Sequence, residues 1–259
     1  MTSSEHDWQR LIEDMAAGET RAADAYPKLD SLAPLIEAKR QDKPLIIAQL
    51  GQSLDGRIAT ASGDSHYING PAALQHLHRL RALVDAVVVG AGTVISDDPQ
   101  LTVRRVPGPS PTRIIIDPNN RAQERQRWCR DDGCQHFRIV RAGDGERNGA
   151  KNDNIAVDCD GSAQIPVPAI LTKLQQRGFK RLLIEGGATT VSQWLQAGAL
   201  DRLHVLIGPL ILGDGPVGLS LTPTGPEIAD AWHPAMSTHP LPSGDLLVDC
   251  DLRAVPTNP

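Results

Sequence analysis

Two turns with paired glycines follow apolar runs in this sequence, and both have the composition of a ligand-binding turn. Gly90 and Gly92 follow AVVV, and Gly186 and Gly187 follow RLLIE. A glycine lets the main chain turn sharply and lets a ligand approach the backbone closely. The second pair precedes small, hydroxylated residues at the start of a predicted helix, where free N–H groups attract phosphate oxygens. The chemistry that these turns favour is therefore the binding of a phosphorylated ligand.

Neither turn matches a standard nucleotide-binding motif. The stretches GAGTVI and GGATTV do not complete G-x-G-x-x-G, and the sequence has no GK[ST] of a P-loop. A third apolar run, LHVLI, also leaves through glycines in GPLILGDG. Glycine-rich strand ends are common in ordinary turns, so each one is a weak signal alone. Any phosphate must be held by an arrangement other than these two standard motifs.

The order of apolar patterns predicts an α/β fold that presents these turns at one edge of a sheet. The β-branched runs that we interpret as strands are LIIAQL, AVVVG, RIIID, FRIV, NIAV, RLLIE, LHVLI and LLVDC. Runs with the apolar spacing of amphipathic helices are PAALQHLHRLRALV, PAILTKLQQRG and TTVSQWLQAG. This alternation predicts a mostly parallel central sheet with helices on both faces. In such sheets ligands bind at the carboxyl ends of the strands, where the glycine turns lie.

Composition restricts the class of protein further. The 259 residues are 40% hydrophobic and only 3% aromatic, so the core must consist mainly of aliphatic side chains. The net charge of −5, without basic blocks, disfavours a general nucleic-acid surface. No stretch approaches the roughly 18 apolar residues of a membrane span, and we expect a cytoplasmic protein that does not bind membranes. The four cysteines form no CxxC pair, so neither zinc nor disulfides are expected.

Residues 1–42 differ in composition from the rest of the chain, because they are polar and rich in alanine. The apolar residues at near-helical spacing are Trp8, Leu11, Ile12 and Met15. A second helical stretch, SLAPLIEAKR, ends before Pro44. We expect a helical N-terminal extension over 1–42 that packs on the main domain, 43–259, or contributes to a dimer contact. No residue of the extension is expected to take part in chemistry.

A longer series of motifs is more specific than either glycine turn. In chain order the sequence contains LGQSLDGRIAT, SGDSHYING, Arg81, GAGTVISDDPQLTVR, RIIID, LIEGGATTVSQWLQAGALDRL and GPLILGDG. From about Pro44 to the C-terminus this series resembles the reductase domain of the riboflavin-biosynthesis deaminase/reductase family, whose fold is dihydrofolate-reductase-like. The H-x-E and P-C-x-x-C motifs of the zinc deaminase half of that family do not occur in the sequence.

The resemblance implies a reaction, a cofactor and an assembly. NADPH would deliver hydride to the ribosyl C1′ of a 5-amino-6-ribosylaminopyrimidine phosphate, through its ring-opened imine, and leave a ribityl chain. Such a site has to hold the nicotinamide against C1′, anchor a sugar phosphate and manage a proton. Members of the family commonly form homodimers, so the resemblance also implies a homodimer.

Carried over position by position, the resemblance assigns residues to both ligands. The substrate-binding positions are Ser65, Arg81, Leu101, Arg104 and Glu185. The cofactor-binding positions are Gly51, Tyr67, Thr93, Asp97, Gly187, Ala188, Thr189, Thr190 and Val191. A guanidinium group matches phosphate oxygens in pairs, which makes Arg81 and Arg104 the expected phosphate anchors. Asp97 and Glu185 are both candidates for the catalytic group that handles the proton, and the sequence does not decide between them.

Ordinary structural roles remain open for four of these residues. Arg81 also fits a solvated position on its helix, and Asp97 also fits a cap of the SDDP turn. The ring of Tyr67 fits stacking on the cofactor or plain packing. Glu185 also fits a carboxylate that accepts backbone N–H groups in the turn.

Two departures from the family pattern keep other functions open. Gln49 stands where many relatives have a lysine, and Pro118, after RIIID, can offer only its carbonyl group. The alternatives are a reductase of the same fold acting on another heterocycle, such as a pteridine, and a nucleotide-binding homologue without turnover. His76 and His78 face different directions on one helix, so we expect no metal site.

Overall fold

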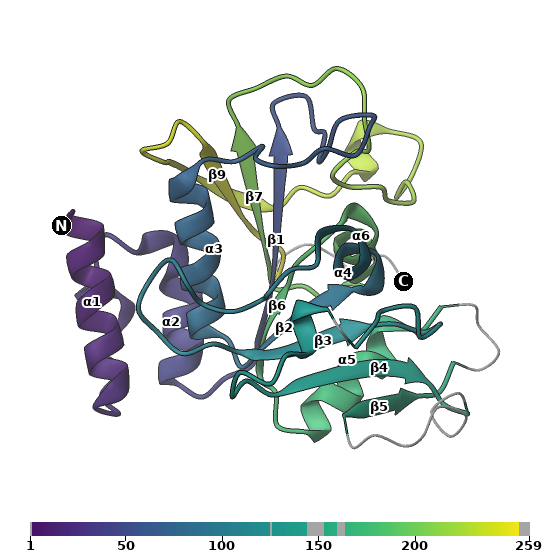
Figure 1. Cartoon of the computed structure of the whole chain (residues 1–259). Coiled ribbons are helices and arrows are strands. Elements are labelled where there is room, and N and C mark those ends of the chain that lie inside the picture. The colour runs from purple at the N-terminus through teal and green to yellow at the C-terminus, as the bar shows by residue number, and fades with distance from the viewer. Residues whose placement is uncertain (1, 125, 144–152, 160–163, 254–259) are drawn as a thin grey trace.

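The computed structural model describes residues 2–124, 126–143, 153–159 and 164–253 (Figure 1). Its strands are β1 Leu45–Ser53, β2 Ala86–Gly90, β3 Thr112–Ile116, β4 His136–Arg141, β5 Asn154–Val157, β6 Arg181–Ile184, β7 Arg202–Gly208, β8 Ala235–Pro240 and β9 Leu246–Asp251. Its α-helices are α1 Ser3–Ala16, α2 Ala33–Arg40, α3 Pro71–Leu83, α4 Ala91–Asp97, α5 Val167–Gln176 and α6 Ala188–Gln196. Every run predicted to be a strand or an amphipathic helix forms one.

The strands lie in one sheet in the order β5-β4-β3-β2-β6-β1-β7-β9-β8. All pairs from β5 to β7 are parallel, and the pairs β7–β9 and β9–β8 are antiparallel. The prediction of a mostly parallel sheet is therefore confirmed. After β1 the chain forms β2 to β5 on one side of the sheet and returns to place β6 between β1 and β2. It then forms β7 on the other side of β1, so the direction of strand addition reverses at β1. Such a switch point is where ligands bind in open α/β sheets.

Helices cover both faces of the sheet, as Figure 1 shows. Side chains alternate along each strand, so Ile47 and Leu183 pack with α1, α2 and α3. Their neighbours Ile46 and Leu182 pack with α5 and α6 on the other face. Burial on both faces explains why these strands appear in the sequence as continuous apolar runs and not as alternating ones.

The N-terminal segment packs on the α3 face of the sheet. Thr2 caps α1 by accepting the N–H of Glu5, which favours the start of a helix at this point. Trp8 of α1 is 2% exposed and lies in the same buried cluster as Leu80 of α3 and Leu35 of α2. The extension therefore shares a hydrophobic core with the sheet.

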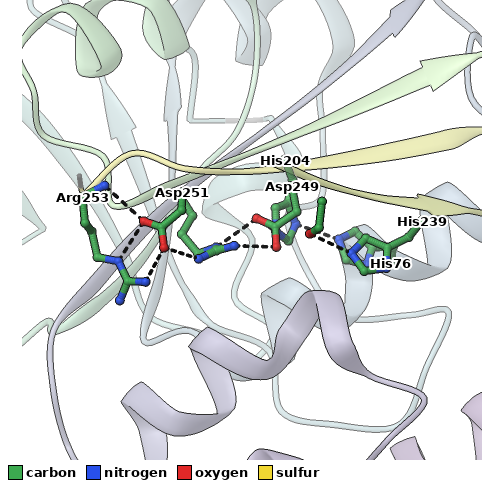
Figure 2. A network of polar contacts seen from close by, with 8 residues as sticks. His76, His204, His239, Asp249, Asp251 and Arg253 are labelled. Atoms are coloured by element: carbon green, nitrogen blue, oxygen red, sulfur yellow. Dashed lines mark hydrogen bonds and ion pairs between the residues drawn. The ribbon is translucent and has the colours of Figure 1, made fainter. Parts of the chain in front are cut away.

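A chain of buried polar contacts joins α3 to the antiparallel side of the sheet (Figure 2). His76 Nε2 lies 2.9 Å from His204 Nδ1, and His204 Nε2 lies 3.2 Å from Asp249 Oδ1. Arg202 donates to both oxygens of Asp249 at 2.9 and 2.7 Å and to Asp251 at 3.0 Å. Each charged side chain named in this network has a partner of opposite charge, as burial requires.

The part of the chain that the structure describes lacks a membrane-spanning helix, a metal cluster and a disulfide. None of its helices combines the length and the apolar content needed to cross a membrane. The same residues contain no group of three or more His, Cys, Asp and Glu side chains placed to hold a metal ion. All four cysteines are free thiols.

Candidate active site

A cavity of about 550 Å3 opens at the carboxyl ends of three neighbouring strands. Its walls include Gly51 of β1, Val89 of β2 and Glu185, which directly follows β6. This is the switch point of the sheet. The volume lies within the range of about 300–1,000 Å3 that is usual for ligand sites.

Ten of the residues predicted to contact ligands line this cavity. They are Gly51, Ser65, Tyr67, Arg81, Thr93, Asp97, Leu101, Arg104, Glu185 and Gly187. The other four, Ala188, Thr189, Thr190 and Val191, form the first turn of α6, directly beyond Gly187. The side chain of Val191 is buried in the core. The N–H groups at the start of α6 are therefore the groups that this turn can offer to a ligand.

Arg81 and Glu185 form an ion pair inside the cavity. Arg81, in the last turn of α3, donates from Nε and Nη2 to Oε1 and Oε2 of Glu185 at 2.7 and 2.6 Å. Its Nη1 donates to the carbonyl of Thr102 at 3.0 Å. The two residues are only 5% and 6% exposed. This two-point contact fixes the orientation of the carboxylate, so Arg81 already has a partner within the protein. That Arg81 also contacts a phosphate stays a prediction.

Two further guanidinium groups lie at the rim of the cavity. Arg104 and Arg105 are both exposed, and Arg104 donates to Thr102 Oγ1 at 3.1 Å. Partial burial, followed by the charges of Arg81 and Arg105, lowers the pKa of Arg104. The cations therefore repel one another, and a bound anion would relieve that repulsion. The rim has the charge expected of a phosphate subsite.

His78 holds the backbone of Arg104, a role that no pattern in the sequence indicates. Its Nδ1 accepts the N–H of Arg104 at 2.9 Å. Burial, together with the charges of Arg81 and Arg104, lowers the pKa of His78 to about 3. The ring is therefore neutral near pH 7, with its proton on Nε2. The two residues lie 26 positions apart, one in a helix and one in a loop, so no periodic pattern in the sequence predicts their contact.

The two glycine turns contact each other through Thr93. The N–H of Gly187 donates to Thr93 Oγ1 at 2.9 Å. Gly186 has a φ of +115°, and a Cβ there would lie 2.8 Å from the same oxygen. A Cβ on Gly90 would lie 2.5 Å from Thr190 Oγ1. The close approach explains these glycines, and the bare backbone at the start of α6 fits the phosphates of a dinucleotide.

The two candidate proton-handling groups lie in different environments. Asp97 is the last residue of α4, and its side chain is exposed at the cavity rim. Glu185 is buried and held by Arg81. Gln49, which replaces the lysine of many relatives, also lines the cavity, whereas Pro118 does not. Compared with a lysine, Gln49 therefore removes a positive charge from the wall of the cavity.

Residues 44–228 match the family model described as the RibD C-terminal domain. The chain belongs to this family. The RibD domain is 34% identical over 174 residues to a 2,5-diamino-6-ribosylamino-4(3H)-pyrimidinone 5′-phosphate reductase from Methanothermobacter thermautotrophicus, covering 66% of this chain and 80% of that protein. It is 31% identical over 209 residues to the riboflavin biosynthesis protein RibD of Escherichia coli, covering 76% of this chain and 56% of that protein. It therefore spans about half the length of that bacterial relative.

Solved structures show the same fold. The RibD domain superposes on Acinetobacter baumannii RibD with a TM-score of 0.68 at 25% identity, covering 88% of this chain and 63% of that one. The riboflavin biosynthesis reductase Rib7 of Saccharomyces cerevisiae gives a TM-score of 0.60 at 21% identity, covering 81% and 90%. At this level of identity the second likeness concerns the fold alone. The resemblance inferred from the motifs is confirmed at the level of the family.

Proposed function

We propose that this RibD domain uses NADPH to reduce the ribosyl group of a 5-amino-6-ribosylaminopyrimidine 5′-phosphate to the ribityl form in riboflavin biosynthesis. The observation that supports the proposal is one cavity that contains the cation of Arg104, the Arg81–Glu185 pair and the glycine-lined start of α6. The name of the Methanothermobacter relative describes a reductase of a phosphate of this type.

The cavity offers separate positions to the two ligands. Bound NADPH supplies the hydride that C1′ of the substrate accepts. The first N–H groups of α6, which Gly187 and its bond to Thr93 hold in place, would bind the pyrophosphate oxygens, where the helix dipole favours negative charge. Gly51 of β1 lines the cavity, but the space beside its Cα is filled by Asn69, whose Oδ1 would lie 2.1 Å from a Cβ there. Tyr67, 70% exposed at the cavity, supplies a ring to stack on the cofactor.

On the substrate side, Arg104 binds the phosphate and Glu185 binds the sugar. A guanidinium group at an exposed rim can donate two hydrogen bonds to a phosphate. Glu185 lies deeper, and Arg81 keeps its carboxylate in one orientation while a sugar hydroxyl or the nitrogen attached to C1′ donates to it. Ser65 and Leu101 complete this side of the cavity. We assign the proton-handling role to Glu185, and Asp97 to the cofactor side.

We also propose a homodimer and a location in the cytoplasm. Strand β8 lies at the edge of the sheet, and Met236 on it is 66% exposed, so this edge is free to pair with a second copy. The proposed location follows from the ligands, because NADPH and sugar phosphates are charged metabolites that do not cross membranes unaided. Light scattering on the purified protein gives the oligomeric state directly, and a monomer at micromolar concentration would remove the dimer from the proposal.

The test of the activity is the loss of absorbance in the reduced-nicotinamide band with freshly made ribosylaminopyrimidine phosphate. The diamino and the uracil forms of the substrate are compared, each with NADPH and with NADH, and a dihydropterin serves as the alternative heterocycle. We expect turnover with a phosphorylated pyrimidine and NADPH. Turnover of the dihydropterin alone would favour a pteridine reductase. Tight NADPH binding without turnover of any compound would favour the non-catalytic alternative.

A further inference from the structure

The loop that carries Arg104 has no regular structure of its own. Residues 102–110 form neither a helix nor a strand. Val103 N–H donates to Ser110 Oγ at 3.0 Å, and Arg104 N–H donates to His78 at 2.9 Å. These bonds hold the beginning of the loop but leave residues 106–109 to other contacts. The position of Arg104 therefore depends on what holds the far part of the loop.

Helix α1 supplies that contact. The indole Nε1 of Trp8 donates to the carbonyl of Pro107 at 3.0 Å, across 99 residues of sequence. The next residue, Gly108, has a φ of +138°, and a Cβ there would lie 2.8 Å from Cβ of Ala82 and 3.3 Å from Cδ1 of Ile12. The loop is therefore pressed between α1 and α3, with the glycine at the point of closest approach.

Trp8 is itself fixed by α3. The guanidinium group of Arg79 lies over the indole ring, 5.4 Å from its centroid. Nη1 of Arg79 donates to Ser4 Oγ at 2.7 Å, which ties the first turn of α1 to α3. Arg79 is 8% exposed and Trp8 is 2% exposed, so both contacts are shielded from water. The ring of Trp8 thus has one position, and its N–H points at the loop.

We infer that Trp8 is a positioning residue for substrate binding, acting through the Pro107 carbonyl on the loop that carries Arg104. Helix α1 lies outside residues 44–228, which match the family model. The inference rests on the proposed function, because it takes Arg104 as the phosphate anchor. Helix α6 packs on the opposite face of the sheet from Trp8, so we expect the loss of the Trp8 donor to have little effect on the part of the cofactor site at the start of α6.

The experiment uses the full chain with Trp8→Phe, which keeps an aromatic ring and removes the donor. The loss of one hydrogen bond of about 1 kcal/mol corresponds to roughly a fivefold change in an equilibrium constant. We expect KM for the phosphorylated substrate to rise about fivefold, with kcat and the Kd for NADPH within twofold of wild type. The matched control is Trp232→Phe, because the indole nitrogen of Trp232 has no hydrogen-bond partner among the described residues.

A second measurement does not depend on activity. Hydrogen exchange followed by mass spectrometry should show faster exchange in Trp8→Phe for the peptide that covers residues 103–110, while peptides from α5 exchange as in wild type. Unchanged exchange in that loop would overturn the inference, as would equal losses of substrate and NADPH affinity. If Trp8→Phe does not fold, Ser4→Ala carries the same test with smaller changes. If the proposed function is wrong, the wild type will not turn over the substrate. The exchange measurement still tests whether Trp8 holds the loop, so the two failures can be told apart.

Discussion

At the residue scale, Glu185 cannot be altered alone without consequences for Arg81. The two side chains satisfy each other in a site that is almost closed to water. Removing one partner of such a pair leaves the other charge buried, which typically costs about 3–5 kcal/mol of stability. Replacing both partners with apolar side chains of similar size is often neutral. This difference allows the structural role of the pair to be separated from its role in the reaction.

We expect Glu185→Gln to lower the free energy of unfolding by about 3 kcal/mol, because the Arg81 charge stays buried without its counterion. The double variant Arg81→Met, Glu185→Leu should regain most of that stability. Both variants should lose at least about a hundredfold in kcat, since the carboxylate is absent from each. Urea unfolding and steady-state turnover measure the two effects. Recovery of turnover in the double variant would show that the pair serves stability alone.

Arg104→Ala tests the phosphate subsite. Hydrogen bonds to charged groups contribute about 1.5–3 kcal/mol, so KM for the phosphorylated substrate should rise about 10- to 150-fold. The Kd for NADPH should stay within twofold, because the cofactor phosphates are assigned to the start of α6. Arg177→Ala, an exposed arginine after α5, is the control for a general loss of positive charge. Equal weakening of both ligands in titrations would contradict the separate assignment.

At the element scale, the starts of α4 and α6 form one unit because Thr93 bridges them. Thr93→Val removes the acceptor of the Gly187 N–H and keeps the shape of the side chain. We expect about a fivefold rise in the Kd for NADPH, with a smaller effect on the substrate, since a lost hydrogen bond is worth about 1 kcal/mol. Thr93→Ser keeps the hydroxyl group and should bind NADPH as the wild type does. Fluorescence titration of the two variants makes the comparison, and matching affinities would remove Thr93 from the cofactor site.

The strands of the parallel sheet could be predicted because burial on both faces leaves continuous aliphatic runs. Strand β8, AMSTHP, was missed for the opposite reason. It is an edge strand with mostly exposed side chains, and it ends in a proline. Its pairing with β9 is the only property that makes it a strand, and pairing is not visible in the sequence of one segment.

The motif series named residues that line one cavity, but it did not indicate their contacts with one another. The motif series placed Arg81, Arg104 and Glu185 on the ligand side, and the structure brings all three to one cavity. The pairing of Arg81 with Glu185 spans 104 residues, and that of Trp8 with Pro107 spans 99. Such contacts depend on how helices cross the sheet. No local pattern in either segment encodes them.

At the scale of the whole molecule, the α3 face of the sheet contains three buried histidines that the fold keeps neutral. Burial is the main cause of the lowered pKa of His76, His78 and His204. In the unfolded chain each returns to the ordinary value of about 6.5. At pH values below 6.5 the unfolded state therefore binds protons that the folded state does not. The contribution of these histidines to the free energy of unfolding is fully present well above pH 6.5 and decreases as the pH falls through 6.5.

We predict that the free energy of unfolding decreases between pH 6.5 and pH 4.5, by at most about 1.4 kcal/mol per pH unit for each of these histidines. The Asp249 carboxylate does not contribute in this range. Burial opposes its charge, but hydrogen bonds from His204 and Arg202 outweigh burial and lower its pKa to about 2. His78→Gln retains an acceptor for the Arg104 N–H and cannot titrate, so its stability should depend less steeply on pH. Urea unfolding at several pH values compares the two slopes. A variant as steep as the wild type would mean that His78 is protonated in the folded state at mildly acidic pH.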